Sequence, residues 1–259
     1  MGADASKVHL PQKIWKRPEN LGPRIWYEEG DIVVRDVTPD LKPFVLEHMK
    51  KYYLNDEPMN KALHTTDDES TTTEQILMWE NCIYPDNVSI AALKKGTPGA
   101  DMDKVSVENP PVIVGVNQLF VSSKNDPPFP DFKEAVKSEK LLRCLNTFRQ
   151  TSRMVNVFER YGVDHYIDGG GMSVSPEWRG KGIGQMLVQA RYNLCKEMGI
   201  PLTKTIFTAV QSQKVALKGG FELLGEILYK DLKEPDGQIR FPDMPPEHTR
   251  IMLMAKRIE

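Results

Sequence analysis

The chain has 259 residues, a formal net charge of −2 from 34 basic and 36 acidic side chains, and 40% hydrophobic residues. These values are ordinary for a soluble globular protein of one large or two small domains. They give no general attraction to nucleic acid or to a membrane surface. No apolar run approaches the roughly 20 residues of a membrane span.

The amino terminus is polar and lacks a signal-peptide core. Gly2 and Ser6 fit a myristoylation pattern, but no basic patch or second anchor accompanies them. The three cysteines, Cys82, Cys144 and Cys195, are far apart and form no Cys-x-x-Cys pair. They predict reduced thiols in a cytoplasmic protein. Cys195 is expected to fill a small apolar space, with a nucleophile as the alternative.

Residues 1–29 show no clear period but contain Trp15, Trp26 and Tyr27, so we expect an irregular arm laid over the domain by its aromatic side chains. From Ile32 to the end, within a domain of residues 30–259, continuous apolar runs predict strands, and apolar residues repeated every three or four positions predict helices. In chain order the predicted elements are a strand at Ile32–Asp36, a helix from 38 to about 55, a short helix at 59–63, a helix over 76–83, strands at 88–93 and 111–121, a long helix from 141 to about 161, a strand at 165–174, a helix over 183–198, a strand at 202–208, a short helix at 213–218, and strands at 221–229 and 250–256.

The segments 96–109 and 122–130, rich in polar residues, Gly or Pro, are expected to be loops. The order of elements shows no internal repeat, and the composition does not break in a way that would mark two domains. The sequence therefore predicts one mixed α/β domain, with a mixed central sheet of about seven strands flanked by helices.

The most informative segment is residues 172–187, in which an apolar strand leads through Ser175 and Pro176 into a basic, glycine-spaced turn and then an amphipathic helix. Glycines allow close backbone approach, and the first N–H groups of a helix lack internal partners, so such a turn favours phosphate oxygens. The Walker pattern fails because Gly182, not Ser or Thr, follows Lys181. The dinucleotide pattern fails because Gln185 stands where Gly is required. A diphosphate cradle of the acyl-coenzyme A kind remains, with a turn whose glycines serve only the chain path as the alternative.

This segment resembles motif A of the GNAT-type N-acetyltransferases, whose signature is Gln/Arg-x-x-Gly-x-Gly/Ala; here the motif is carried by Arg179, Gly182 and Gly184. Three other segments are similar to the insect arylalkylamine N-acetyltransferases, the dopamine-acetylating branch: Asn55-Asp56-Glu57-Pro58-Met59-Asn60, residues 168–174, and residues 252–256. The likeness covers roughly residues 31–257. It implies a GNAT-like domain in which two central strands splay apart around acetyl-CoA, and direct acetyl transfer to the primary amine of a small arylalkylamine within a ternary complex.

The resemblance also implies roles for individual residues. Glu57 matches the family's general base, acting through water, and the alternative is an ordinary surface acid beside Asp56. Ser212 and Thr208 match hydroxyl positions near the thiolate, although Ser212 could instead be the N-cap of the helix at 213–218. The pantetheine arm would pair with the backbone of Met172, Ser173 and Val174 as though it were a strand. The diphosphate would be held by the backbone N–H groups of Arg179, Gly180, Lys181, Gly182, Ile183 and Gly184.

Two departures leave the chemistry and the substrate open. Gln211 stands where many relatives have a tyrosine able to donate a proton, and Gly219 stands where a larger apolar residue is common. Aromatic residues Phe44, Tyr52 and Tyr53 could line an aryl pocket or belong to the core.

The acidic run at 67–69 keeps a polyamine substrate open, a peptide amine is a further alternative, and a non-catalytic acyl-CoA-binding module is a third. The five histidines show no ligand spacing, so no metal is expected. His48 is expected to be a partly exposed helix residue, with a cleft base as its alternative. A cytoplasmic monomer whose partner is a small-molecule amine is the expected state.

Overall fold

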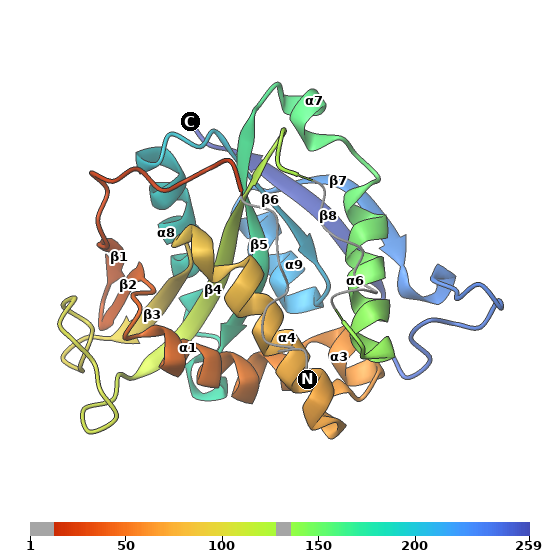
Figure 1. Cartoon of the computed structure of the whole chain (residues 1–259), viewed down its shortest axis with the longest axis horizontal. Helices are drawn as coiled ribbons and strands as arrows, with labels where there is room; N and C mark the ends of the chain where they lie inside the picture. The colour runs from red at the N-terminus through yellow and green to blue at the C-terminus, as the bar shows by residue number, and fades with distance from the viewer. Residues whose placement is uncertain (1–12, 128–135) are drawn as a thin grey trace, which may run out of the picture.

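The computed structural model describes residues 13–127 and 136–259, so the myristoylation pattern, part of the predicted arm and the end of the loop predicted at 122–130 lie outside the described residues. An eight-stranded mixed sheet runs through the centre in the order β1-β2-β3-β4-β5-β6-β8-β7 (Figure 1). The predicted mixed α/β domain is confirmed, and about seven strands was close.

The strand that the sequence analysis missed is β1 (Ile25–Glu29), which was wrongly assigned to the irregular arm. It pairs antiparallel with β2 (Ile32–Asp36), and Glu29 stands opposite Ile32. The intervening Gly30 has φ +54°, the left-handed backbone that a two-residue hairpin turn requires. The Gly30-Asp31 pair was therefore a usable hairpin signal in the sequence.

The remaining strands follow the predicted order along the chain, with small shifts at their ends. Every neighbouring pair in the sheet is antiparallel except β5 and β6, which are parallel and joined by a helix. The strands are β3 (Ile90–Lys94), β4 (Ile113–Ser123), β5 (His165–Val174), β6 (Leu202–Phe207), β7 (Glu222–Leu228) and β8 (Arg250–Arg257).

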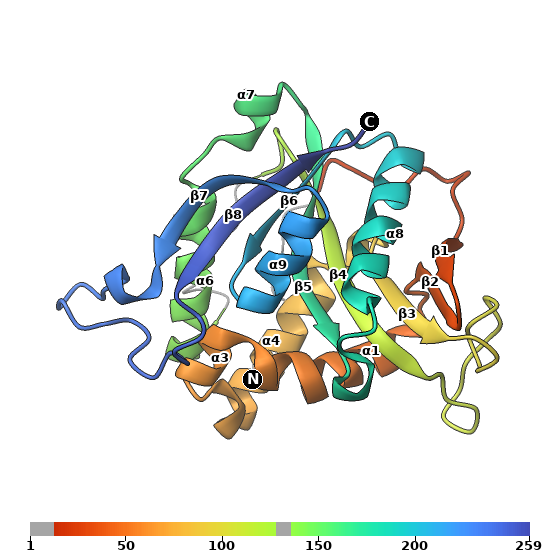
Figure 2. The same ribbon diagram turned by 180° about the vertical axis from the view of Figure 1, so that it is seen from behind.

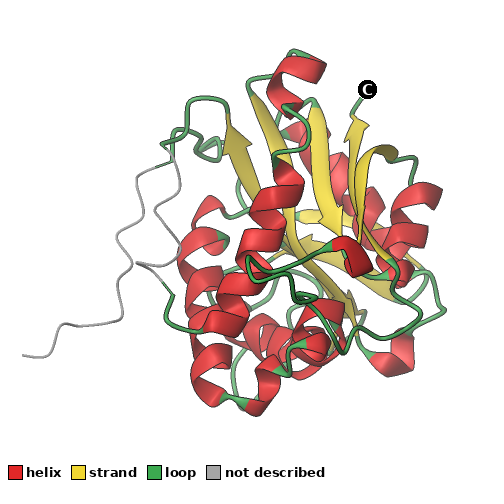
Figure 3. Ribbon diagram, turned by 90° about the vertical axis from the view of Figure 1, so that its right-hand side faces the viewer, coloured by secondary structure: helices red, strands yellow, loops and turns green. Residues whose placement is uncertain are grey.

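Helices cover both faces of this sheet, and the edge-on view places the sheet between the two layers (Figure 3). One layer contains α8 (Ile183–Glu197) and α9 (Val210–Lys218), which lie towards the viewer in Figure 2. The other layer begins with α1 (Lys42–His48), which continues through a π-helical turn (Met49–Tyr53) into α2 (Leu54–Asp56), so the predicted end near Asn55 is confirmed. It is completed by α3 (Pro58–Ala62), α4 (Glu69–Cys82), α6 (Glu139–Ser152) and α7 (Val157–Tyr161).

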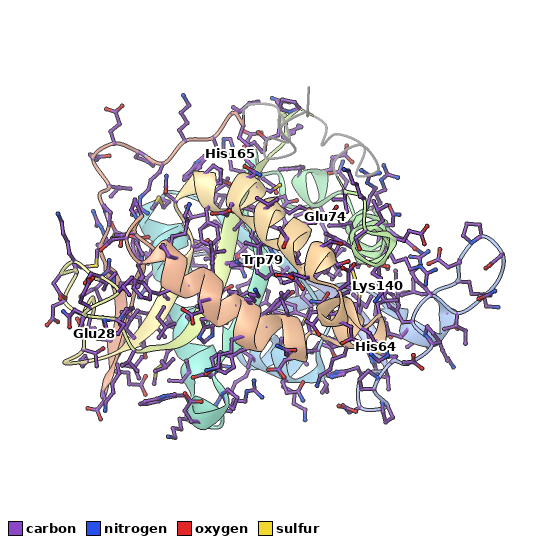
Figure 4. All side chains as sticks on the ribbon, turned by 60° about the horizontal axis from the view of Figure 1, so that its bottom comes forward. Glu28, His64, Glu74, Trp79, Lys140 and His165 are labelled. Atoms are coloured by element: carbon purple, nitrogen blue, oxygen red, sulfur yellow. The ribbon has the colours of Figure 1, made fainter. Side chains whose placement is uncertain are left out.

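Polar contacts join α6 to α4 and to His64, which precedes α4; Glu74, Lys140 and His64 are labelled in Figure 4. Glu74 of α4 accepts the backbone N–H of Ser138, the N-cap of α6, at 2.9 Å. Lys140 donates to the carbonyl of His64 at 2.8 Å. In the part of the chain that the structure describes, no helix has the length and apolarity needed to cross a membrane.

The long helix predicted over 141–161 is in fact two helices. α6 ends at Ser152, and Asn156 begins α7 by accepting the N–H of Glu159. An asparagine side chain that bonds the backbone in this way favours a new helix start over a helix interior. The apolar spacing had continued across this break and hid it.

The strands β5 and β6 diverge after a short contact. Their register contains only two pairs, Ile167 with Thr203 and Asp168 with Lys204. Gly169 still touches β6, since a Cβ there would lie 2.5 Å from the Oγ1 atom of Thr205. Beyond this point β5 stays on β4 and β6 stays on β8, so the expected splay of the two central strands is confirmed.

Candidate functional site

The gap between the splayed strands belongs to a cavity of about 1440 Å³. Its walls include the unpaired part of β5, the glycine turn before α8, the start of α3 and the turn between β6 and α9. Trp79, on the inner side of α4, adds to the wall (Figure 4). The cavity therefore brings together segments that lie far apart in sequence, from Lys13 near one end of the chain to His248 near the other.

The glycine turn is shaped as an anion site. Gly180 and Gly182 have φ values of +75° and +83°, which L-residues with side chains rarely adopt. Among the described residues, no acceptor is bonded to the backbone N–H groups of residues 180–184. These groups precede or open the 15-residue helix α8, whose dipole places partial positive charge there. Such an array suits a phosphate or diphosphate.

The two basic side chains of the turn lie differently from its backbone. Arg179 forms an ion pair with Asp56 at the end of α2, and its Nε donates to the carbonyl of Val174 at 3.0 Å. The Nζ of Lys181 lies 4.7 Å from the centre of the Trp178 ring, and its side chain does not line the cavity. Arg179 thus ties the turn to the segment that carries Glu57.

Met172, Ser173 and Val174 line the cavity along the free edge of β5. They pair with β4 on one side, where Val174 stands opposite Gly115, and have no strand on the other. Backbone groups on such an edge are available to a ligand that presents amides in an extended chain.

Glu57 is buried, with 5% of its surface exposed, so the alternative of an ordinary surface acid is wrong. Its backbone is extended (φ −65°, ψ 125°), as expected before Pro58, and it is the N-cap of α3. Its Oε2 accepts the N–H of Asn60 at 2.7 Å, whereas its Oε1 has no partner. Burial raises the pKa of this carboxyl, and the Asn60 N–H and the nearby Thr208 hydroxyl partly offset that effect. A buried carboxylate with a raised pKa and a free oxygen can accept a proton.

Thr208 lies on the turn that follows β6, Ser212 lies in the first turn of α9, and both line the cavity. Tyr229 donates its hydroxyl to the carbonyl of Thr208 at 3.0 Å and so fixes this turn. The N-cap alternative for Ser212 is wrong, because α9 begins at Val210 and its cap is Ala209. The hydroxyl of Ser212 instead donates to the carbonyl of Ala209 at 2.9 Å.

The aromatic wall differs from the expected one. Tyr53 lines the cavity, but Tyr52 packs edge-on against His48, and Phe44, which belongs to α1, packs half-buried against the core. His48 itself is buried away from the cavity, and burial lowers its pKa to about 4, so neither expectation for it holds. The sequence did not indicate the other aromatic residues that line the cavity: Trp15, Trp79, Phe120, Phe148, Phe158, Tyr166, Trp178 and Phe207.

Charged residues that the sequence did not indicate also line the cavity. Asp86 and Asp168 are buried and line the cavity, and each forms an ion pair with a lysine, Lys13 and Lys204. Burial acts to lower the pKa of Lys204, but the neighbouring Asp168 outweighs it and the pKa is raised, so this lysine is charged at neutral pH. The acidic run at 67–69 lies outside the cavity, where Asp68 caps α4.

Within residues 13–127 and 136–259, no group of three or more His, Cys, Asp or Glu side chains is arranged to hold a metal ion. The buried cysteines Cys144 and Cys195 have pKa values raised by burial, to about 12 for Cys195. A raised pKa disfavours the thiolate and with it the nucleophile alternative for Cys195.

Comparison with known proteins agrees with this geometry. The sequence model of the acetyltransferase (GNAT) family matches residues 125–219, which contain β5, the glycine turn, α8 and α9. The chain contains a GNAT acetyltransferase domain. Among solved structures it is similar to a protein of the yellow fever mosquito Aedes aegypti designated putative arylalkylamine N-acetyltransferase 7, with 28% identity, a TM-score of 0.80, and 95% of this chain and 100% of that chain covered.

Two further structures share the fold at lower identity. Arylalkylamine N-acetyltransferase 2 from Aedes aegypti has 23% identity and a TM-score of 0.71, over 89% of this chain and 100% of that one. A polyamine N-acetyltransferase from Drosophila melanogaster, which forms N-acetylagmatine, has 17% identity and a TM-score of 0.69, over 88% and 100%. The family match and the 28%-identical structure, together with the motif-bearing turn, support an N-acetyltransferase.

Proposed function

We propose that this enzyme transfers an acetyl group from acetyl-CoA directly to the primary amine of a small arylalkylamine or related biogenic amine, within a ternary complex. One observation carries the proposal. A single cavity is lined by the glycine turn with its free N–H groups, by the unpaired edge of β5, and by the buried carboxylate of Glu57, which has no cationic partner.

The residues present fit acetyl-CoA, which would supply the acetyl group as a thioester. The free N–H groups of residues 180–184 would hold the diphosphate, and the edge of Met172, Ser173 and Val174 would pair with the pantetheine amides. The guanidinium of Arg179, now paired with Asp56, lies beside the same turn and adds positive charge there.

The amine must lose a proton before it attacks, because alkylamines are mostly cationic at neutral pH. We assign Glu57 as the base that takes this proton, because its Oε1 has no partner and its pKa is raised by burial. Thr208 and Ser212 present hydroxyl groups to the same cavity and would stabilise charge that develops on the departing sulfur, for which the Ser212 hydroxyl would turn away from the Ala209 carbonyl. Gln211 also lines the cavity but cannot act as the acid, so the thiolate would be released without a phenol donor.

A non-catalytic acyl-CoA-binding module is the second candidate, and Gln211 is the observation that favours it. A thiol-release assay over a panel of aryl, alkyl and peptide amines tests both. Turnover of arylalkylamines with acetyl-CoA supports the enzyme. Thermal stabilisation by coenzyme A without turnover of any amine would instead establish the binding module.

We also infer a cytoplasmic monomer that needs no metal and acts on small molecules. Its three cysteines are free, as expected for a reducing compartment. Sedimentation of the purified chain tests the oligomeric state, and activity retained in a metal chelator tests the cofactor requirement.

A further inference from the structure

Three buried carboxylates line the cavity in the part of the chain that the structure describes: Glu57, Asp86 and Asp168. Two of them already carry a lysine, and only Glu57 does not. The cavity therefore presents a cationic substrate with one buried, unpaired carboxylate, which is the residue that we assign as the base.

The first ion pair joins the chain before β1 to the sheet. The Nζ of Lys13 lies 2.5 Å from Oδ2 of Asp86, donates to the carbonyl of Val121 at 3.2 Å, and lies 4.9 Å from the centre of the Phe120 ring. The same carboxylate accepts the N–H of Val121 at 2.8 Å. Lys13 thus neutralises a carboxylate that is buried in the wall of the cavity near the Phe120 ring.

The second ion pair lies where β5 and β6 begin to diverge, at the last pair of their register. The Nζ of Lys204 lies 2.7 Å from Oδ2 of Asp168 and 3.3 Å from the hydroxyl of Ser152 on α6. The other oxygen of Asp168 accepts the N–H of Gly169 at 2.9 Å. Each of the two carboxylates therefore has both a lysine and a backbone donor.

Both pairs lie at one level of the sheet. Val121, which bonds Asp86, stands opposite Ile167 in the β4–β5 register, and Asp168 is the next residue along β5. The glycine turn follows the other end of β5, six residues further on, which is about 20 Å at the rise of an extended strand. The lysines consequently lie far from the anion-binding turn, in the half of the cavity that is left for the amine.

We infer that Lys13 and Lys204 are specificity-determining residues that restrict the acetyl acceptor to amines with a single ammonium group. A second ammonium entering this half would lose its hydration and meet lysines in place of unpaired carboxylates, an arrangement that opposes binding. Lys16 and Arg153, exposed at the cavity wall, add charge of the same sign. The half-buried Asp126, which also lines the cavity, opposes it, but its two oxygens already accept the N–H groups of Ile14 and Ser123. This inference rests on the proposed function and names the substrate class of that site as monoamines whose far end is neutral or anionic.

The test compares two amines of equal chain length, hexylamine and cadaverine, in which a terminal methyl group is replaced by an ammonium. The measured quantity is the ratio of kcat/KM for hexylamine to that for cadaverine. The unaltered enzyme should give a ratio of about ten or more. Lys13→Met frees the carboxylate of Asp86 for the second ammonium and should lower the ratio by about tenfold. Adding Asp86→Asn to this variant removes that carboxylate and should restore the ratio.

Lys95→Met is the matched control, because it removes the same charge from a surface pair with Glu28, at 2.9 Å, that lies outside the cavity. Melting temperature with and without coenzyme A reports that each variant is folded. An unaltered enzyme that uses both amines equally would overturn the inference, even if no Lys13 variant folds. A folded Lys13→Met enzyme with an unchanged ratio would also overturn it, while turnover of hexylamine would leave the proposed function standing. Absence of turnover with every monoamine would overturn the proposed function itself and the inference that rests on it.

Discussion

Replacing Glu57 by Gln separates the chemistry of this carboxyl from its structural role. A glutamine can keep the 2.7 Å hydrogen bond from the Asn60 N–H, so the N-cap of α3, a contact typically worth about 0.5–2 kcal/mol, is retained. What is lost is the oxygen that can take a proton. General-base catalysis contributes about 10²–10⁴-fold, so kcat/KM should fall by that factor, which corresponds to ~2.7–5.5 kcal/mol in the barrier.

The same substitution should stabilise the fold at neutral pH. The pKa of Glu57 is raised above its ordinary value of 4.5, chiefly by burial. A raised pKa means that the protonated carboxyl contributes stability below about pH 4.5, and this contribution is lost as the pH rises through the folded-state pKa. The melting temperature of Glu57→Gln relative to the unaltered enzyme should therefore increase from pH 4.5 upwards.

Two measurements check the predicted loss of catalysis: thiol release over a range of arylalkylamine concentrations, which gives kcat/KM, and calorimetry of coenzyme A binding. Affinity for coenzyme A should be nearly unchanged in both Glu57→Gln and Glu57→Ala. A loss of cofactor affinity as large as the loss of kcat/KM, or a kcat/KM within about threefold of the original, would refute the role of general base.

Three other substitutions have expected outcomes. Gly182→Ala forces a side chain into a backbone with φ +83°, so it should lower the free energy of unfolding by about 1–2 kcal/mol and weaken coenzyme A binding. The control Gly199→Ala, with φ +65° just after α8, should lower the stability by a similar amount without affecting that affinity. Melting curves report the stability, and calorimetry reports the affinity. Thr208→Val removes a hydroxyl that lowers the pKa of Glu57, so the acidic limb of the kcat/KM profile should move to higher pH, while Thr208→Ser should leave it in place. Lys204→Met leaves Asp168 buried without its cation and should lower the free energy of unfolding by about 3–5 kcal/mol in urea titrations; a loss below about 1 kcal/mol would contradict the buried pairing.

Local patterns predicted much of the fold and part of the site. The strand β5, the glycine turn and the amphipathic helix α8 are consecutive in sequence, so residue type and period were sufficient to place them. The missed features have weaker local signals. β1 needed the hairpin character of Gly30-Asp31 to be recognised, and the break between α6 and α7 was hidden by apolar spacing that continued across it.

The sequence by itself determined the glycine turn, because its glycines and its helix start are adjacent and their backbone preferences act locally. Glu57 was singled out through the resemblance of residues 55–60 to the family, and its role as base stays a proposal. Only the tertiary structure decided the environment of that carboxyl and the charge of the cavity. Lys13 and Asp86 are 73 residues apart, and Lys204 and Asp168 are 36 apart. No periodic pattern encodes such pairs, since their proximity follows from how the sheet and its two helical layers pack.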